Sequence, residues 1–316
     1  MTRPLVSVLI PCFNAERYIG ETIDSVLGQT WPEIEIVIVN DGSTDRSSHE
    51  IGRFAARPNL VVLDRPNKGA AASRNEALRH SRGEFIQYLD ADDLLSPEKI
   101  ELQVRRIENQ RYSIASAEWG RFYTMPDEAE FQAEEVWRDL APLDWLALSR
   151  RDGLGMMFPA LWLVPRSVVV AAGPWAEDLS LTDDMEFFTR VLLSSERVLF
   201  SAGARCYYRS GVRGSLSGRK TPAAWDSQFR AIDLCERSVL AREDSDRMRR
   251  GFALSWQHLA HACHPYHREL AKNALMRARA LHAVHVDPGG GPAFRCVARL
   301  FGWRLARRLQ VASGRP

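Results

Sequence analysis

Short apolar runs alternate with segments of helical periodicity along the first third of the chain. Strands are predicted over residues 6–10, 34–39, 60–63 and 85–89, and helices over residues 15–29 and 70–80. The next helix is expected to open at Ser96-Pro97-Glu98, where Ser96 can serve as the cap. Because strands alternate with helices up to about residue 108, the pattern predicts an α/β fold with a mostly parallel sheet flanked by helices.

The later pattern is less regular. Residues 111–155 show no readable period, and a strand pair is predicted over 198–209. Short helices are predicted from Pro165 to Gly173 and from Thr182 or Asp183, either of which can cap, to about Ser195. Residues 222–285 are helical in pattern, and one last helix is predicted over 293–310 after a Pro/Gly linker. The chain therefore divides into residues 1–110, 111–220 and a C-terminal helical extension, 221–316.

Three carboxylates, Asp90, Asp92 and Asp93, follow directly after the buried strand 85–89. Like charges so close repel one another, and a cation at this position would neutralise them. Oxygen ligands favour Mg²⁺ or Mn²⁺. The alternative is a helix N-cap, but Ser96 can supply that cap, so the alternative leaves the acids unexplained.

Other polar segments also follow strand ends. Asp41 ends the second strand, Asn67-Lys68-Gly69 follows the third, and Asp183-Asp184 opens a later helix. Ligands of open parallel sheets bind beyond the carboxyl ends of the strands, so the side chains that follow the strands are expected to converge on one ligand, whereas Asp183-Asp184 lies at a helix start. The basic loop 210–220 suits a polyphosphate, although an ordinary solvated loop has the same composition.

Composition limits the partners. The 316 residues carry a net charge of only +2, and six arginines with no acid lie in residues 293–316, so the main body is slightly acidic and no nucleic-acid partner is expected. Five scattered cysteines and the lack of a signal or transmembrane segment favour a cytoplasmic protein. The last helix has an apolar stripe, formed by Phe294, Val297, Ala298, Phe301, Leu305 and Leu309. It either binds the cytoplasmic face of an anionic membrane peripherally or docks on the protein.

Taken together, the ordered motifs resemble the family 2 inverting glycosyltransferases with the GT-A fold, over about residues 4–218. The motifs are Val8-Leu9-Ile10-Pro11-Cys12-Phe13-Asn14-Ala15-Glu16, Val39-Asn40-Asp41-Gly42-Ser43-Thr44-Asp45, Asn67-Lys68-Gly69 with Ala72-Ser73-Arg74-Asn75, Asp90-Ala91-Asp92-Asp93 and Thr182-Asp183-Asp184. The resemblance implies that residues 1–110 form the nucleotide-sugar-binding half of a GT-A domain and residues 111–220 the acceptor-binding half.

The resemblance also implies individual roles. Pro11 and Phe13 would border the nucleobase, and Asp41 would accept a hydrogen bond from a uracil imide. Asp92 would bind the metal, and Asp184 would be the catalytic base. The remaining implied residues line the nucleotide cleft (Lys68, Gly69, Arg74), face the ribose or donor sugar (Asp90) or contact phosphate (Arg209, Arg213).

The implied activity is metal-dependent transfer, with Mn²⁺ or Mg²⁺, of a sugar from a nucleotide-sugar donor, expected to be a UDP-sugar. The acceptor would be a saccharide or lipid-linked hydroxyl in polysaccharide, glycolipid or other glycoconjugate synthesis. The chain departs from the family where Asp183-Asp184 replaces a frequent Glu-Asp pair and where no histidine follows Tyr208-Arg209.

Two other functions compete with sugar transfer. A non-catalytic nucleotide-binding or interaction protein on the same scaffold predicts decay of the acids, yet Asp41, Asp90, Asp92 and Asp184 are all present. A nucleotidyltransferase would want a glycine-rich, arginine-bearing loop after the first strand, where this chain has Pro11-Cys12-Phe13-Asn14.

Overall fold

A computed structural model describes residues 3–153, 155–212, 218, 220–282 and 291–313. The chain forms two compact units, one of Met1–Leu146 with Met157–Ser215 and one of Ala147–Met156 with Leu216–Pro316. The first unit contains every described residue to which the resemblance assigns a role. The expected boundary near residue 110, inside this unit, stays a prediction.

The main sheet of the first unit has the strand order β3-β2-β1-β4-β7. Its strands are β1 (Val6–Cys12), β2 (Ile34–Asn40), β3 (Leu60–Asp64), β4 (Phe85–Tyr88) and β7 (Val164–Pro165). The first four are parallel and β7 is antiparallel to β4. All seven residues of β2 are buried, as expected for a central strand covered on both faces. The predicted, mostly parallel sheet is confirmed.

Three helices connect the four parallel strands: α1 (Ile19–Leu27), α2 (Ser47–Gly52) and α3 (Ala70–His80), and α4 (Lys99–Ile107) follows later in the chain, after β4. The bounds of α3 are those predicted, whereas α1 begins later than expected. The Ser96 side chain does not cap α4, because its Oγ accepts the backbone N–H of Arg205 at 3.1 Å. The expected Ser96 cap is therefore wrong, since a long-range partner uses the hydroxyl.

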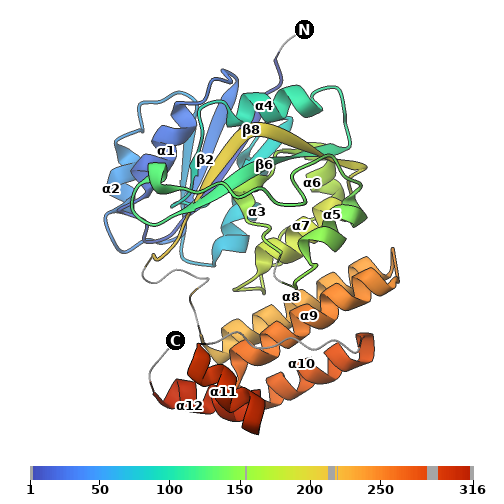
Figure 1. Cartoon of the computed structure of the whole chain (residues 1–316). Helices are drawn as coiled ribbons and strands as arrows, with labels where there is room; N and C mark the ends of the chain where they lie inside the picture. The colour runs from blue at the N-terminus through green and yellow to red at the C-terminus, as the bar shows by residue number, and fades with distance from the viewer. Residues whose placement is uncertain (1–2, 154, 213–217, 219, 283–290, 314–316) are drawn as a thin grey trace. The chain divides into compact units, whose positions relative to one another are not determined.

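A second sheet, of order β5-β8-β6, is built from β5 (Leu94–Leu95), β6 (Ser113–Phe122) and β8 (Arg197–Arg209). Figure 1 shows β8 in yellow beside β6. The predicted strand pair over 198–209 is wrong, because β8 is a single strand. Its turn-like residues form a bulge, where Gly203 has φ +80° and the register with β6 shifts at Ala117/Glu118.

The rest of the first unit contributes three helices, α5 (Pro142–Ser149), α6 (Arg166–Ala172) and α7 (Asp183–Leu193). The last residues of α5, from Ala147 on, are assigned to the second unit. The predicted helices before Gly173 and after Thr182 are confirmed. An aromatic cluster connects α7 to the main sheet: the Trp175 ring stacks on Phe187 with centroids 4.0 Å apart, and Tyr88 of β4 meets Trp175 edge-on at 5.1 Å. This cluster fixes the start of α7 beside the end of β4.

The second unit is helical, as predicted. It contains α8 (Pro222–Leu240), α9 (Asp246–Cys263), α10 (Arg268–Leu281), α11 (Pro292–Phe301) and α12 (Trp303–Ala312). Residues 147–156 join it, because Ser255 of α9 donates to the Gly153 carbonyl at 3.0 Å. The unit contains no residue assigned to nucleotide, metal or base.

The single last helix predicted over 293–310 is wrong, because the chain breaks between α11 and α12 at Gly302, where φ is +84°. The predicted stripe is therefore shared between two helices: Phe294 of α11 is buried, whereas Phe301 of the same helix and Leu305 and Leu309 of α12 are exposed. The Trp303 ring packs 4.4 Å from that of His261 on α9, which holds α12 against the unit. Among the described helices, none combines the length and the apolar character needed to cross a bilayer.

Candidate active site

The acids after β4 lie in a crowded, poorly solvated position. Asp93 is 1% exposed and accepts the backbone N–H of Arg209 at 2.9 Å, so it ties the end of β8 to this loop. Burial and the neighbouring Asp92 raise the pKa of Asp93 well above its usual value. Burial and the charge of Asp90 raise the pKa of Asp92 to about 6. The loop therefore holds more negative charge than its surroundings compensate.

Arg209 stabilises the loop after β4 that carries these acids. Its side chain is buried, and it donates to the Asp92 carbonyl at 2.9 Å and to Glu21 at 2.6 Å. Its guanidinium also lies 4.7 Å from the ring centroid of Tyr18. A phosphate role for Arg209 stays a prediction, and Arg213 lies outside the described residues.

The donor set of the loop fits a hard divalent cation. Asp90 and Asp92 offer carboxylate oxygens only, and the raised pKa of Asp92 is the response expected where a cation is needed to balance charge. Within the described part of the chain, no three His, Cys, Asp or Glu residues gather into a metal cage. A metal here would take its other ligands from a bound diphosphate and water.

Asp184 lies in the first turn of α7. Its Oδ1 accepts the Met185 N–H at 2.7 Å, and burial together with Asp183 raises its pKa to about 7. Thr182 occupies the N-cap position with φ +64°, a strained conformation for a β-branched residue, and makes no side-chain cap. Of the two candidate caps, Thr182 therefore makes no cap bond and Asp183 pairs with Arg74, so the start of α7 is held by other contacts.

One of those contacts joins α7 to the acids after β4. Arg74 of α3 donates from Nη2 to Asp90 and from Nη1 to Asp183, each at 2.7 Å. The structure thereby brings the predicted residues Arg74, Asp90 and Asp184 into one cluster. Arg74 itself is 5% exposed.

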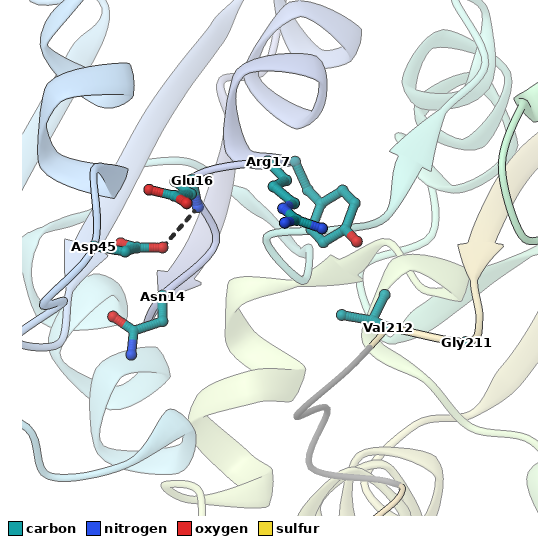
Figure 2. Close-up of a pocket in the computed structure, with 7 residues that line it drawn as sticks. Asn14, Glu16, Arg17, Asp45, Gly211 and Val212 are labelled. Atoms are coloured by element: carbon teal, nitrogen blue, oxygen red, sulfur yellow. Dashed lines mark hydrogen bonds between the residues drawn. The ribbon is translucent and has the colours of Figure 1, made fainter.

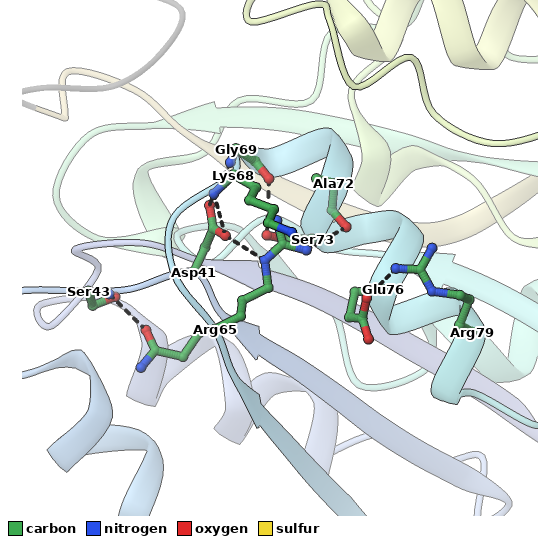
Figure 3. A network of polar contacts seen from close by, with 10 residues as sticks. Asp41, Ser43, Arg65, Lys68, Gly69, Ala72, Ser73, Glu76 and Arg79 are labelled. Carbon is green, nitrogen blue, oxygen red and sulfur yellow. Dashed lines mark hydrogen bonds and ion pairs between the residues drawn. The ribbon is translucent and has the colours of Figure 1, made fainter.

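Asp41 organises the loop that leads into α3 (Figure 3). It is 2% exposed, and its oxygens accept the backbone N–H groups of Lys68 at 3.0 Å and Gly69 at 2.8 Å, and Arg65 Nε at 2.8 Å. The structure therefore places Asp41, Lys68 and Gly69 together, with the Lys68 side chain exposed.

A cavity of about 500 Å³ opens after β1 (Figure 2). Phe13, at the start of this loop, is 44% exposed, and Pro11 is half-buried. Two acids in the lining are already hydrogen-bonded, because Asp45 accepts the Glu16 N–H at 3.1 Å and Glu16 accepts the Arg46 N–H at 2.8 Å. The lining residues are Asn14, Glu16, Arg17, Tyr18, Asp45, Gly211 and Val212.

Sequence reasoning missed several residues that shape this site. Asn75 donates to the Trp175 carbonyl at 3.0 Å and accepts the Trp175 N–H at 2.8 Å. These two hydrogen bonds fix the segment before α7 to α3. The available signal was a polar residue, Asn75, next to Arg74 in an alanine-rich helix. Arg17 and Tyr18 gave none, because a basic and an aromatic residue at a helix start are ordinary.

Comparison with known proteins supports the family resemblance. Residues 7–169 match the family described as Glycosyl transferase family 2. An uncharacterized glycosyltransferase of Rickettsia felis is 30% identical over 194 residues, which are 60% of this chain and 31% of the relative. Chondroitin synthase of Pasteurella multocida is 40% identical over 100 residues, 31% of this chain and 10% of the synthase. The chain thus spans less than a third of the length of either relative.

Solved structures share the fold. TarS residues 1–349 of S. aureus, in complex with UDP, superimpose with a TM-score of 0.65 at 16% identity, covering 98% of this chain and 92% of that one. The mannosyltransferase PcManGT of Pyrobaculum calidifontis, with GDP-Man and Mn²⁺, gives 0.56 at 19% identity, covering 100% and 89%. The predicted GT-A-type fold is confirmed. Because the family match covers just over half of this chain, the chain belongs to glycosyl transferase family 2.

Proposed function

We propose that this protein transfers a sugar from a UDP-sugar to an acceptor hydroxyl with inversion at the anomeric carbon, using Mn²⁺ or Mg²⁺. The observation that carries the proposal is Asp184, a carboxylate with a pKa raised to about 7, in one cluster with the acids after β4. A general base works best when its pKa lies near the working pH.

Asp184 serves the acceptor. Because its Oδ1 accepts the Met185 N–H, Oδ2 is the oxygen that takes the proton from the acceptor hydroxyl. The acceptor oxygen then forms its bond to the anomeric carbon while the bond to the diphosphate breaks on the opposite face. One displacement inverts the configuration and needs one protein carboxylate, unlike the carboxylate pairs of hydrolases.

The acids after β4 serve the leaving group. Asp92, beside Asp90, would hold the divalent cation, which supplies positive charge to the departing diphosphate. Arg209 adds its positive charge behind the loop, where it donates to the Asp92 carbonyl. Lys68, exposed at the start of α3, and Gly69, whose backbone lies open, would line the nucleotide cleft.

Uridine is the proposed base. The exposed ring of Phe13 would stack on a pyrimidine that Pro11 also borders, and Asp41 would accept the imide N–H in addition to its present donors. A neighbour of the same fold, TarS, was crystallised with UDP-GlcNAc, which supports this choice, whereas PcManGT was crystallised with GDP-Man. Calorimetry with Mn²⁺ and the diphosphates of uridine, thymidine, guanosine and cytidine tests the preference. Tighter binding of guanosine or cytidine diphosphate would contradict it.

The reaction is tested by incubating the protein with UDP-sugars, Mn²⁺ and saccharide or lipid-linked acceptors, and by reading the anomeric configuration of the product by NMR. We expect inversion and loss of transfer in EDTA. Retention, or full activity in EDTA, would overturn the mechanism. Nucleotide binding without turnover on any acceptor would instead favour a non-catalytic binding protein.

We further propose that the C-terminal helices contact an anionic bilayer on its cytoplasmic face. Leu300 and Phe301 are each 69% exposed, and residues 291–313 carry five arginines and no acid. Co-sedimentation with phosphatidylglycerol-containing vesicles should exceed that with phosphatidylcholine alone and fall with salt.

Phe301→Asp should weaken this vesicle binding, whereas Met276→Asp, at a 52% exposed apolar side chain of α10, should leave it unchanged. Equal binding of both variants and the parent protein would remove the bilayer contact from the proposal.

A further inference from the structure

Arg74 occupies a position that a nucleotide ligand does not explain. It lies in the second turn of α3, and its side chain is 6% exposed. Each terminal nitrogen already pairs with a different acid: Nη2 with Asp90 after β4, and Nη1 with Asp183 at the start of α7, both at 2.7 Å. Each terminal nitrogen of its planar fork therefore has an acidic partner before any ligand binds.

An aromatic ring packs against the guanidinium of Arg74. The group lies 4.3 Å from the ring centroid of Trp175, and the Trp175 ring stacks on Phe187 of α7 at 4.0 Å. The neighbouring Asn75 holds the Trp175 backbone with two hydrogen bonds, of 3.0 Å and 2.8 Å. Two consecutive residues of α3 thus position both the ring and the backbone of the segment that leads to α7.

The charge of Arg74 is balanced by three carboxylates. Asp90, Asp183 and Asp184 all raise the pKa of Arg74, against the effect of its burial. In return, the positive charge opposes the rise in the pKa of Asp184 that burial and Asp183 cause. Without Arg74, three acids from two elements would face one another at close range with no cation between them.

We propose that Arg74 is a positioning residue that couples the donor-side acid Asp90 to the base-bearing helix α7, and that it does not act by contacting the nucleotide. Its catalytic consequence rests on the proposed sugar transfer, whereas the bridge itself does not. A rigid bridge fixes the position of the leaving-group side of the site relative to the acceptor side, and a single in-line displacement requires this alignment.

The proposal is tested by comparing the melting temperature and kcat of the single variants with those of the double variant. Arg74→Met leaves two crowded carboxylates unpaired, so the melting temperature should fall by several degrees and kcat by about 100-fold. Asp183→Asn alone should also lower both, because it removes a partner of Arg74. Combined with Arg74→Met, however, Asp183→Asn removes one unpaired charge, so the double variant should be more stable than Arg74→Met and recover kcat several-fold.

A nucleotide-contact role predicts the opposite pattern. In that case UDP affinity with Mn²⁺ would fall with Arg74→Met by as much as kcat does, and Asp183→Asn could restore neither affinity nor turnover. Under our proposal, the loss in kcat exceeds the loss in UDP affinity. Arg74→Lys keeps the charge but cannot span both acids, so its stability and kcat should fall between those of the parent protein and Arg74→Met.

Arg190→Met is the matched control. Arg190 lies on the same helix α7, pairs with Glu186 at 2.7 Å and lies 5.4 Å from the Phe187 centroid, but contacts none of the three site acids. It should lose stability with kcat nearly unchanged. If Arg74→Met does not fold, the comparison of Arg74→Lys with Arg74→Lys/Asp183→Asn makes the same test.

The melting temperatures need no substrate, so they separate the two proposals. If no sugar is transferred by the parent protein, the proposed function fails while the stability pattern still tests the bridge. A double variant no more stable than its single Arg74 variant would overturn the bridge.

Discussion

Two strand ends of the main sheet carry aspartates in similar sequence settings, yet their surroundings differ. Asp41, at the end of β2, is surrounded by donors: two backbone N–H groups and Arg65 bind its oxygens. Asp92, after β4, faces Asp90 instead, and the cost of charge repulsion and burial raises its pKa to about 6.

An acid at a strand end therefore has no fixed role. The loop after β3 returns its N–H groups to Asp41, which therefore stabilises the backbone around α3. The loop after β4 carries further acids, and the surrounding groups do not fully compensate their negative charge. The first arrangement shapes a binding loop, and the second is suited to hold a cation.

The largest expected effect is that of Asp92→Asn, which should reduce transfer at least 1,000-fold and remove the Mn²⁺ dependence of UDP binding. Without metal, the variant should melt a few degrees higher than the parent protein at pH 7, because it removes a charge that the fold disfavours.

The sign of this stability effect depends on pH. The raised pKa of Asp92 means that the parent protein loses stability as pH rises from about 4 through 6, so the advantage of Asp92→Asn should vanish near pH 4. Calorimetry in EDTA at pH 4 and pH 7 measures it. Lower stability of the variant at pH 7 would contradict the comparison.

Asp184→Asn should lower kcat by roughly 10²–10⁴, because an amide cannot accept the acceptor's proton, with UDP affinity nearly unchanged. Because the pKa of Asp184 lies at about 7 and its charged form is the base, activity of the parent protein should rise with pH through about 7. Single-turnover assays beside calorimetry measure both. Since Asn and Asp cap helices equally well, near-native turnover would reduce Asp184 to a helix-start residue.

Asp41→Asn should have the opposite effect on stability from Asp92→Asn. An amide offers one acceptor oxygen, so a backbone N–H of Lys68 or Gly69 loses its partner, at about 1–3 kcal/mol of unfolding free energy. UDP affinity should fall about tenfold as the loop loosens. Urea unfolding and calorimetry check this, with Asp64→Asn, at the exposed end of β3, as the control. A stabilised Asp41→Asn would erase the contrast between the strand ends.

Gly69→Ala tests the conformation of the loop that Asp41 holds. Gly69 has φ +94° and ψ 165°, a conformation that alanine rarely adopts, although a Cβ would meet no atom within 4 Å. The cost should be about 1–3 kcal/mol, from backbone strain alone. Gly52→Ala, at the open end of α2, is the control and should cost nothing. Equal effects of the two substitutions in urea unfolding would argue against a fixed loop.

Long-range contacts also explain where sequence-based expectations failed. Nothing near Ser96 indicates that its hydroxyl accepts an N–H from β8, and nothing near Gly203 distinguishes a bulge from a turn. Gly302 looked compatible with a helix of one period, yet its positive φ ends α11 and starts α12. In each case a partner distant in the chain, or a backbone conformation open to glycine, decided between two locally acceptable structures.

The alternation of strands and helices, the bounds of α3 and the place of the acids after β4 could all be predicted from the sequence, because they follow from apolar periodicity over a few residues. Contacts between distant elements give Asp41 three hydrogen-bond donors but raise the pKa of Asp92 through burial and Asp90. They also bring Arg74 to Asp90 and Asp183, which lie 16 and 109 residues from it in the chain. The reason is that burial and charge compensation depend on which elements meet in space, and no local pattern records those meetings.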